Sequence, residues 1–227
     1  MRCCYNFHSR DHSARQTYFI RQPGKTGRIG FPGQDMNSED LLKMLMEKAA
    51  GKTAVLALDG RCAAGKSTLA GKLADRWGAA LFHMDDFYLQ PKQRTKERLA
   101  EPGGNVDRER FLAEVLEPLR AGKTVEYRRF DCRTMSFENP RLIPENRIAI
   151  VEGSYACHPE LRGYYDLRIF LDIDPETQLE RIRRRNGPEG AERFRNIWIP
   201  LEEAYFNGCR VRECCDLVLS PSETESI

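Results

Sequence analysis

The residue types that could carry chemistry gather first in a glycine-rich stretch, residues 60–68, which reads GRCAAGKST. Its spacing is G-x-x-x-x-G-K-[S/T], the pattern of a phosphate-binding loop. Glycines 60 and 65 permit backbone angles that a side chain would forbid, so the N–H groups between them can turn inward toward phosphate oxygens. The candidate nucleotide-binding residues are Gly60, Arg61, Cys62, Ala63, Ala64, Gly65, Lys66, Ser67 and Thr68.

Two residues of this loop have separate expected roles. Lys66 should reach the β- and γ-phosphates of a nucleotide, and the Ser67 hydroxyl should bind Mg²⁺. Gly-Lys-Thr also occurs at residues 24–26, 51–53 and 122–124, but none of these copies has a glycine five places before its Gly-Lys pair. The copy at 60–68 alone completes the pattern and follows an apolar run that predicts a buried strand.

Acidic residues stand where two further strands are expected to end. Asp85 and Asp86 close a strand predicted over 79–84, and Glu152 lies in a buried-strand run at 147–156. Ligands bind at the carboxyl ends of strands in open α/β sheets, so one of the paired acids could accept the proton of an attacking hydroxyl or hold Mg²⁺ through water. Glu152 suits the holding of a metal-bound water. The alternatives are a helix-capping or turn acid at 85–86 and a chance acid at 152.

The predicted strand 166–174 ends in a second pair of acids, Asp172 and Asp174. A structural role is preferred for both, because Asp174-Pro175 reads as a helix cap followed by proline in the first turn. The elements that must position all these residues are therefore strands alternating with helices.

The helix after residue 174 carries an arginine cluster, LERIRRRNG at residues 179–187. At about 100° per residue, Arg183 shares the apolar side with Leu179 and Ile182. The arginines expected on the opposite side are Arg181, Arg184 and Arg185. Their guanidinium groups could stabilise a transferring phosphoryl group, although a solvated charged face is the common alternative.

Length and composition fit a globular enzyme. The chain has 227 residues, of which 41% are hydrophobic and 31% charged. No apolar run approaches the roughly 20 residues that span a membrane, and the start lacks the apolar core of a signal peptide. A cytoplasmic protein without membrane partners is therefore expected. The eight cysteines form no C-x-x-C pair, which favours free thiols.

The charge distribution separates the first 36 residues from the rest. They hold six Lys or Arg and two Asp, so their charge is +4 and the remainder of a +2 chain carries 2 − 4 = −2. A mildly acidic folded part argues against a nucleic-acid partner. Residues 1–36 have no sustained periodicity, so we expect a disordered extension, or a stretch upstream of a true start at Met36, followed by a single domain at 37–227.

The order of these motifs over about residues 53–220 resembles a known group. Strand–phosphate loop–helix is followed by a strand ending in Asp-Asp-Phe-Tyr, a strand ending in Glu-Gly and an arginine-rich helix. This order is similar to that of the uridine kinase, phosphoribulokinase and pantothenate kinase group of P-loop kinases. The resemblance implies an α/β P-loop NTPase fold: a five-stranded parallel sheet flanked by helices, with a helical lid over ATP. A small strand insertion near the substrate is expected at 124–137.

The resemblance also implies residue roles. Asp85 would be the general base that takes the proton from a primary hydroxyl, with Lys66 a further catalytic candidate. Ser67 would bind Mg²⁺, with Asp85 and Glu152 close to the metal. The arginines implied for the lid are Arg181, Arg184 and Arg185. The aromatic residues implied to line the acceptor pocket are Phe87 and Tyr88.

One stretch departs from the pattern of uridine kinases, which typically show Tyr-Asp-Phe followed by a histidine that reads the pyrimidine. Residues 127–133 read YRRFDCR instead, without that histidine. The replacement by arginines makes Arg129 and Arg133 candidate acceptor-binding residues and hints at an acceptor that already carries negative charge.

The leading hypothesis is an ATP- and Mg²⁺-dependent kinase that acts on a hydroxyl of a small molecule, such as a nucleoside or other ribosyl compound. The alternatives are a nucleotide switch or regulatory ATPase without a small-molecule acceptor, and a nucleoside monophosphate kinase, of which Asp-Asp-Phe-Tyr is not the usual signature. A homo-oligomer stays an open expectation.

Overall fold

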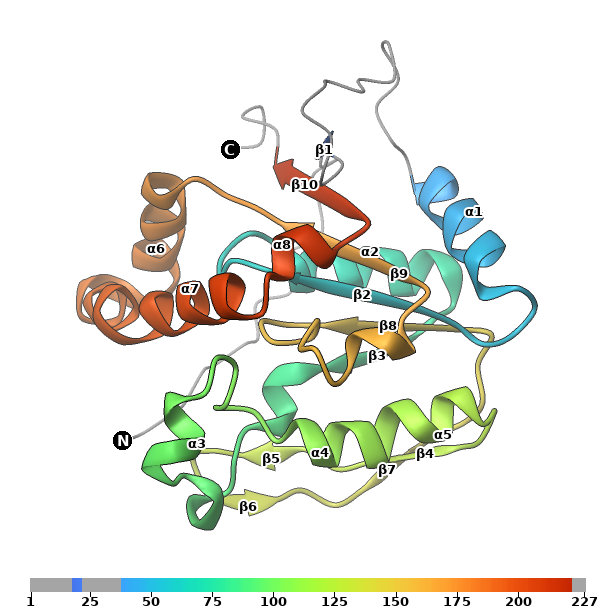
Figure 1. Cartoon of the computed structure of the whole chain (residues 1–227), viewed down its shortest axis with the longest axis horizontal. Coiled ribbons are helices and arrows are strands. Elements are labelled where there is room, and N and C mark those ends of the chain that lie inside the picture. Colours follow the sequence, from blue (N-terminus) through green and yellow to red (C-terminus); the bar gives the residue numbers. More distant parts are fainter. Residues whose placement is uncertain (1–17, 22–37, 222–227) are drawn as a thin grey trace.

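A central β-sheet organises the chain in this computed structural model, which describes residues 18–21 and 38–221 (Figure 1). The strand order is β1-β10-β9-β2-β8-β3. The parallel strands are β2 (Ala54–Gly60), β3 (Ala80–His83), β8 (Ile148–Glu152), β9 (Leu167–Leu171) and β10 (Leu217–Pro221). The predicted five-stranded parallel sheet is thus confirmed.

An additional strand, β1 (Tyr18–Arg21), pairs antiparallel with β10 at the edge of the sheet. These four residues lie inside the segment 1–36, for which the sequence predicts a disordered extension, and the structure describes them as a strand. Backbone pairing with an edge strand supplies hydrogen bonds that the weak local periodicity did not indicate. The remainder of that segment, with Met36, lies outside the described residues.

Both faces of the sheet are covered, which explains the continuous apolar runs. All seven residues of β2 and all five of β8 are buried. On one face, Leu56 and Leu58 pack with α1 (Ser38–Ala49) and α2 (Lys66–Trp77). On the other, Val55 and Ala57 belong to the core that contains residues of the helical segment 108–120. That segment comprises α4 (Arg108–Phe111), a π-helical stretch (Leu112–Leu116) and α5 (Glu117–Arg120).

The predicted strand insertion is present as two small antiparallel sheets. β4 (Val125–Tyr127) pairs with β7 (Arg141–Ile143), and β5 (Phe130–Asp131) pairs with β6 (Ser136–Phe137). Figure 1 shows them beside α4 and α5, at the end of the molecule away from α1. The connection from β3 to α4 contains three short helical pieces, Met84–Phe87, Pro91–Gln93 and α3 (Lys96–Ala100).

The last part of the chain forms a helical arm at the side of the sheet toward which β2 runs (Figure 1). It comprises α6 (Pro175–Arg193), a π-helical stretch (Phe194–Trp198) and α7 (Ile199–Gly208), followed by α8 (Val211–Cys214). Asp174 caps α6 by accepting the N–H of Thr177 at 2.9 Å, which confirms its structural role. The helix is kinked at Gly187, where φ is 73°.

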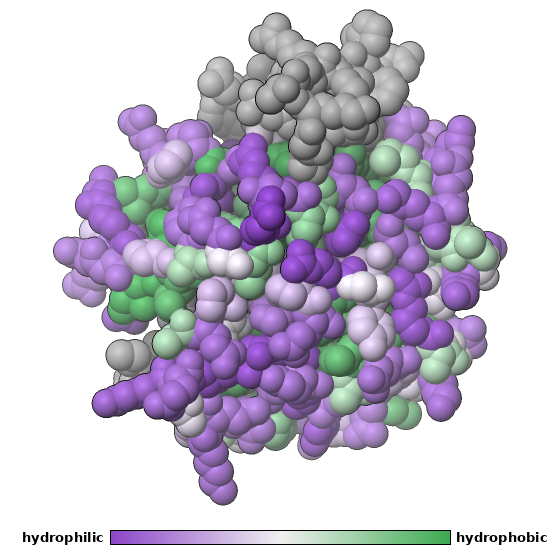
Figure 2. All heavy atoms as spheres, viewed as in Figure 1, coloured by the Kyte–Doolittle hydropathy of each residue, from purple (hydrophilic) through white to green (hydrophobic). Residues whose placement is uncertain are grey.

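The helices, the surface and the thiols can each be described for the part of the chain that the structure covers. Within 18–21 and 38–221 no helix is long and apolar enough to cross a membrane. Hydrophilic residues cover most of the face in Figure 2. The six cysteines among the described residues are free thiols, as predicted.

Candidate active site

The glycine-rich loop connects the buried end of β2 to the start of α2. Gly60 has φ 129°, and a Cβ on it would lie 2.1 Å from the carbonyl oxygen of Leu171. Ala63 and Gly65 also have positive φ, of 61° and 95°. These left-handed angles are the ones that turn successive N–H groups into an anion-binding concavity, at the N-terminus of a twelve-residue helix.

The Lys66 side chain lies folded over the start of this loop. It is buried, and its Nζ donates to the carbonyl oxygens of Gly60 and Arg61 at 2.7 and 2.9 Å. A longer contact of 3.4 Å joins Nζ to the Ser154 hydroxyl. The ammonium group therefore lies against the backbone of the first two loop residues. The sequence predicts that this cation binds phosphate.

Glu152 joins the loop to the strand next to it. Both of its carboxylate oxygens lie within 3.1 Å of the Ser67 hydroxyl. His83, which is opposite Glu152 in the pairing of β3 with β8, places its Nδ1 atom 2.6 Å from Oε1 of the same carboxylate. Burial lowers the pKa of His83, but the hydrogen bond and negative charge of Glu152 outweigh burial and raise it above its ordinary value. Histidine 83 was not among the predicted site residues.

The two adjacent acids occupy different environments. The Asp85 side chain is accessible to solvent and accepts a hydrogen bond from the Tyr88 hydroxyl at 3.2 Å. The pKa of Asp85 is raised to about 6, first because surrounding protein withdraws it from bulk water and next because Glu152 is negative, while Lys66 opposes both. The pKa of Asp85 thus responds to the charges of both Glu152 and Lys66.

Asp86, in contrast, makes structural contacts with the strand insertion. It is buried and accepts a hydrogen bond from the Tyr127 hydroxyl. Arg129 forms an ion pair with it, with Nε 2.9 Å from Oδ1. Asp86 thereby ties the strand insertion to the end of β3. Within the Asp-Asp pair, only Asp85 is accessible to a substrate.

The predicted acceptor-pocket residues are only partly brought together. Phe87 is a correction, because its ring is fully buried against Phe111 and does not reach a surface where an acceptor could bind. The 3₁₀ turn at 84–87 points it into the core. Tyr88 stays beside Asp85, and Arg129 reaches the acids through Asp86. Arg133 is exposed and pairs with Asp131 at 3.3 Å.

The arginine helix meets the loop through one of its three predicted members. Arg181 is half-buried and its Nη1 lies 3.4 Å from the carbonyl oxygen of Ala63. Arg184 and Arg185 are exposed. The placement of Arg183 on the apolar side is wrong, since it is exposed as well.

Further loop contacts come from residues that the sequence did not single out. Gln178 of α6 is buried and donates to the carbonyl oxygen of Cys62 at 3.2 Å. Asp59, at the end of β2, accepts the N–H of Cys157 and the hydroxyl of Tyr205, each at 2.8 Å. Burial raises the pKa of Asp59 to about 6 despite these hydrogen bonds. The adjacency of Asp59 to Gly60 was the only sequence signal for any of them.

The donor set fits Mg²⁺. The Ser67 hydroxyl and the carboxylates of Glu152 and Asp85 offer the oxygen ligands that this ion takes. The part of the chain that the structure describes contains no group of three or more His, Cys, Asp or Glu side chains able to hold a metal by themselves. Mg²⁺ bound here would therefore take further ligands from water and nucleotide phosphates, as it usually does.

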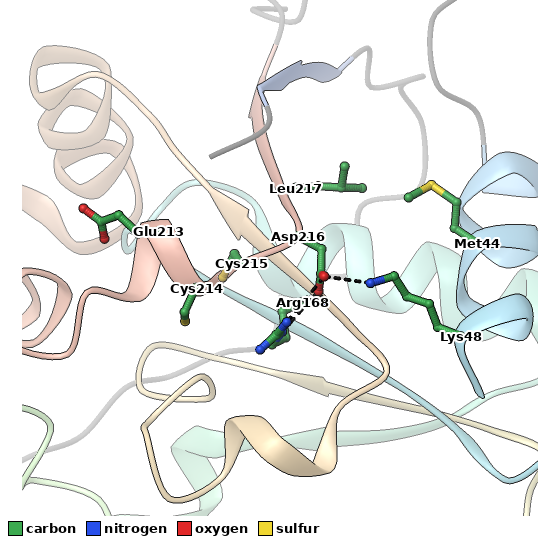
Figure 3. A pocket seen from close by; sticks show the side chains of 8 residues that line it. All are labelled: Met44, Lys48, Arg168, Glu213, Cys214, Cys215, Asp216 and Leu217. Atoms are coloured by element: carbon green, nitrogen blue, oxygen red, sulfur yellow. Dashed lines mark hydrogen bonds and ion pairs between the residues drawn. The ribbon is translucent and has the colours of Figure 1, made fainter. Parts of the chain in front are cut away.

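A separate hollow of about 390 Å³ lies between α1 and the start of β10 (Figure 3). Its cations are already paired: Lys48 Nζ lies 2.7 Å and Arg168 Nε 3.1 Å from carboxylate oxygens of Asp216. None of the loop residues or site acids lines it. This hollow is not the predicted nucleotide site.

The sheet, the loop and the helix that follows it define a P-loop NTPase of the α/β class. The chain belongs to the phosphoribulokinase/uridine kinase family, whose family model matches residues 55–190.

A curated relative agrees with this membership, and solved structures share the fold. The chain is 26% identical over 159 residues to uridine kinase-like protein 3 of Arabidopsis thaliana, which covers 65% of this chain and 34% of that protein. A possible uridine kinase from Bacillus stearothermophilus superimposes with a TM-score of 0.58 at 20% identity, covering 81% of this chain and 99% of that one. D-glycerate 3-kinase of Cryptococcus neoformans gives 0.53 at 16% identity, covering 76% and 88%. The chain thus spans about a third of the length of the curated relative.

Proposed function

We propose that this protein is an ATP-dependent kinase that transfers the γ-phosphoryl group to a hydroxyl of a small molecule. The observation that carries the proposal is the placement of Asp85. It is a solvent-accessible carboxylate at the carboxyl edge of the sheet, and its pKa responds to the charges of Lys66 and Glu152. Phosphoryl transfer to a hydroxyl needs an accessible acid near the phosphate-binding loop, because the hydroxyl must lose its proton. Nucleotide binding alone does not need such an acid.

Each residue has a defined role in this proposal. The loop at 60–68 binds the triphosphate, and Lys66 neutralises its negative charge. Asp85 accepts the proton of the acceptor hydroxyl as that oxygen attacks the γ-phosphorus in line with the leaving ADP. Mg²⁺, when bound near Ser67 and Glu152, supplies charge neutralisation and orients the phosphates. Arg181 adds positive charge on the lid side of the loop.

Positioning supplies most of the acceleration in phosphoryl transfer, so the fixed geometry around the loop matters more than covalent chemistry. The buried ends of β2, β3 and β8 fix Ser67, His83 and Glu152 against one another. Asp85 lies two residues beyond the end of β3, at the carboxyl edge of the sheet where the phosphate-binding loop also begins.

For the acceptor, we propose a nucleoside or another ribosyl compound. The family membership and the name of the Arabidopsis relative support this choice. Arg129 is already paired with Asp86 and with Glu138, so it adds no support for an acceptor that carries a negative group. The name of the solved structure from Cryptococcus neoformans refers to a different acceptor, D-glycerate, so hydroxyl compounds beyond ribosides belong in the test.

The experiment is transfer of label from γ-labelled ATP to a panel of nucleosides, phosphorylated ribosides and other hydroxylated metabolites. The expected result is a labelled product with one acceptor class and little ATP consumption without acceptor. The Asp85→Asn variant is the matched control, which should bind ATP without forming product. Equal ATP turnover with and without every acceptor would instead support the regulatory ATPase and contradict the kinase.

A further inference from the structure

Two side chains of helix α7 contact the phosphate-binding loop, and a third contacts the residue immediately before it. Glu202 accepts the backbone N–H of Cys62 at 3.0 Å. Glu203 forms an ion pair with the guanidinium of Arg61. Tyr205 donates its hydroxyl to Asp59, immediately before the loop. The first third of the loop is therefore held by a helix more than 130 residues further along the chain.

Glu202 is the buried member of this set. Only 5% of it is exposed, and its second carboxylate oxygen accepts a hydrogen bond from the Ser154 hydroxyl at 2.6 Å. Ser154 in turn lies 3.4 Å from Lys66 Nζ. One carboxylate thus holds a loop amide directly and reaches the loop lysine through one hydroxyl.

A buried carboxylate is stable only when it is paired and hydrogen-bonded. Glu202 meets that condition with the Cys62 amide, the Ser154 hydroxyl and the nearby ammonium of Lys66. If Glu202 is removed, the Cys62 amide loses its partner and Ser154 loses the acceptor that orients it toward Lys66. The loop would then no longer be fixed in the shape that receives phosphate.

We propose that Glu202 is a positioning residue for nucleotide binding, which fixes the phosphate-binding loop through Cys62 and fixes Lys66 through Ser154. The inference rests on the proposed binding of ATP by the loop. Glu202 lies in a helical arm that also contains Arg181, so the same arm carries a lid arginine and the support of the loop.

Glu203 provides a matched control from the adjacent position. It also contacts the loop, but its side chain is 35% exposed and its partner is the Arg61 side chain rather than a loop amide. Without Glu203, Arg61 would still have Asp172, 2.9 Å from its Nε. Ion pairs that solvent reaches contribute little. Loss of Glu203 should therefore leave the shape of the loop intact.

The test compares the equilibrium affinity for Mg-ATP, without acceptor, of the wild-type protein, Glu202→Ala, Glu202→Gln and Glu203→Ala. Glu202→Ala should weaken binding at least about tenfold, because a loop amide loses its only acceptor. Glu202→Gln should restore most of the affinity, since its amide oxygen still accepts the Cys62 N–H and its amino group can donate to Ser154. Glu203→Ala should bind like the wild type.

Thermal unfolding without nucleotide separates positioning from a merely structural role. Wild-type affinity in a folded Glu202→Ala protein would overturn the inference, even if its melting temperature fell. If Glu202→Ala does not fold, Ser154→Ala carries the test, with affinity expected to fall several-fold and an unchanged affinity contradicting the inference. A wild-type protein that does not bind Mg-ATP at all would contradict the proposed function itself.

Discussion

The Nδ1 atom of His83 lies 2.6 Å from Oε1 of Glu152, where β3 and β8 end side by side. The other partner of Glu152 is the hydroxyl of Ser67, at the start of the helix after the loop. One carboxylate therefore connects a titratable imidazole to the predicted metal-binding hydroxyl. Protonation of His83 is stabilised by this contact, so a positive charge persists near Asp85 to higher pH than an isolated histidine would allow.

The first prediction concerns the pH dependence of the reaction. A general base must be ionised, and the pKa of Asp85 in the folded protein is raised to about 6. We expect kcat/KM to fall as the pH decreases through about 6, well above the range in which an ordinary aspartate is protonated. The measurement is a pH profile from 4.5 to 8 of kcat/KM for Mg-ATP, which reports on the enzyme before nucleotide and metal bind, and roughly tenfold is lost per pH unit below the limb. A flat profile down to pH 4.5 would remove Asp85 as the base.

The second prediction is that a substitution at His83 shifts the acid limb of the kcat/KM profile. In His83→Ala, the positive charge that faces Asp85 and Glu152 is lost, so ionisation of Asp85 becomes less favourable. The acid limb of kcat/KM should therefore shift to higher pH than in the wild type. The same pH series measures the shift, and a limb that stays in place or moves to lower pH would contradict the electrostatic coupling.

The third prediction separates the two adjacent acids. Asp85→Asn should lower kcat by at least about 10²-fold while the affinity for ATP is kept, because only proton transfer is lost. Asp86→Asn is the comparison, since it weakens the contacts with Arg129 and Tyr127 and should lower the free energy of unfolding. Steady-state kinetics and urea unfolding of both variants give the answer. Near-normal turnover in Asp85→Asn would argue against the base assignment.

The fourth prediction concerns the buried ring of Phe87. The centroids of the Phe87 and Phe111 rings are 4.9 Å apart. The guanidinium of Arg110 lies 3.9 Å from the centroid of the Phe87 ring. Phe87→Ala should lower the free energy of unfolding by about 3–5 kcal/mol, as expected for a large side chain removed from a core. Leu142→Ala, at a position 73% exposed, is the control and should have little effect. If Phe87→Ala were as stable as the wild type, the ring would not be a core residue, and a role in the acceptor pocket would be favoured instead.

The fifth prediction tests the arginine that reaches the loop. Arg181→Ala should reduce kcat by at least about tenfold, because a cation aimed at developing phosphoryl charge is removed. Arg183→Ala, two residues away and exposed, should leave kcat within about twofold of the wild type, as surface substitutions commonly do. If the two variants had equal kcat values, Arg181 would have no catalytic role and the arginines would be only a solvated face of the helix.

The strands and the loop could be predicted from the sequence because each is a local pattern. Short apolar runs are buried on both faces of a parallel sheet, and the glycine-rich motif needs its glycines at fixed spacing. The cap at Asp174 follows from one residue and the proline after it. The edge strand β1 was missed because its partner, β10, is about 200 residues away.

The contacts within the site depend on tertiary structure and were less predictable. His83 reaches Glu152 only because β3 lies next to β8, an order that the sequence does not reveal. Glu202 contacts Cys62 only because a distant helix docks on the loop. Phe87 follows Asp85 and Asp86 in sequence, but the 3₁₀ turn sends its ring in the opposite direction to the accessible carboxylate.

Because Gly60 lies so close to the carbonyl oxygen of Leu171, a glycine at this position is required by the fold and does not by itself indicate nucleotide binding. A side chain there would collide with the backbone of β9 whether or not a nucleotide ever binds. A descendant that had abandoned phosphate chemistry would therefore still require glycine at this place to close its sheet. Lys66 and Ser67, which strand packing does not demand, are the better markers of whether such a descendant is still an enzyme.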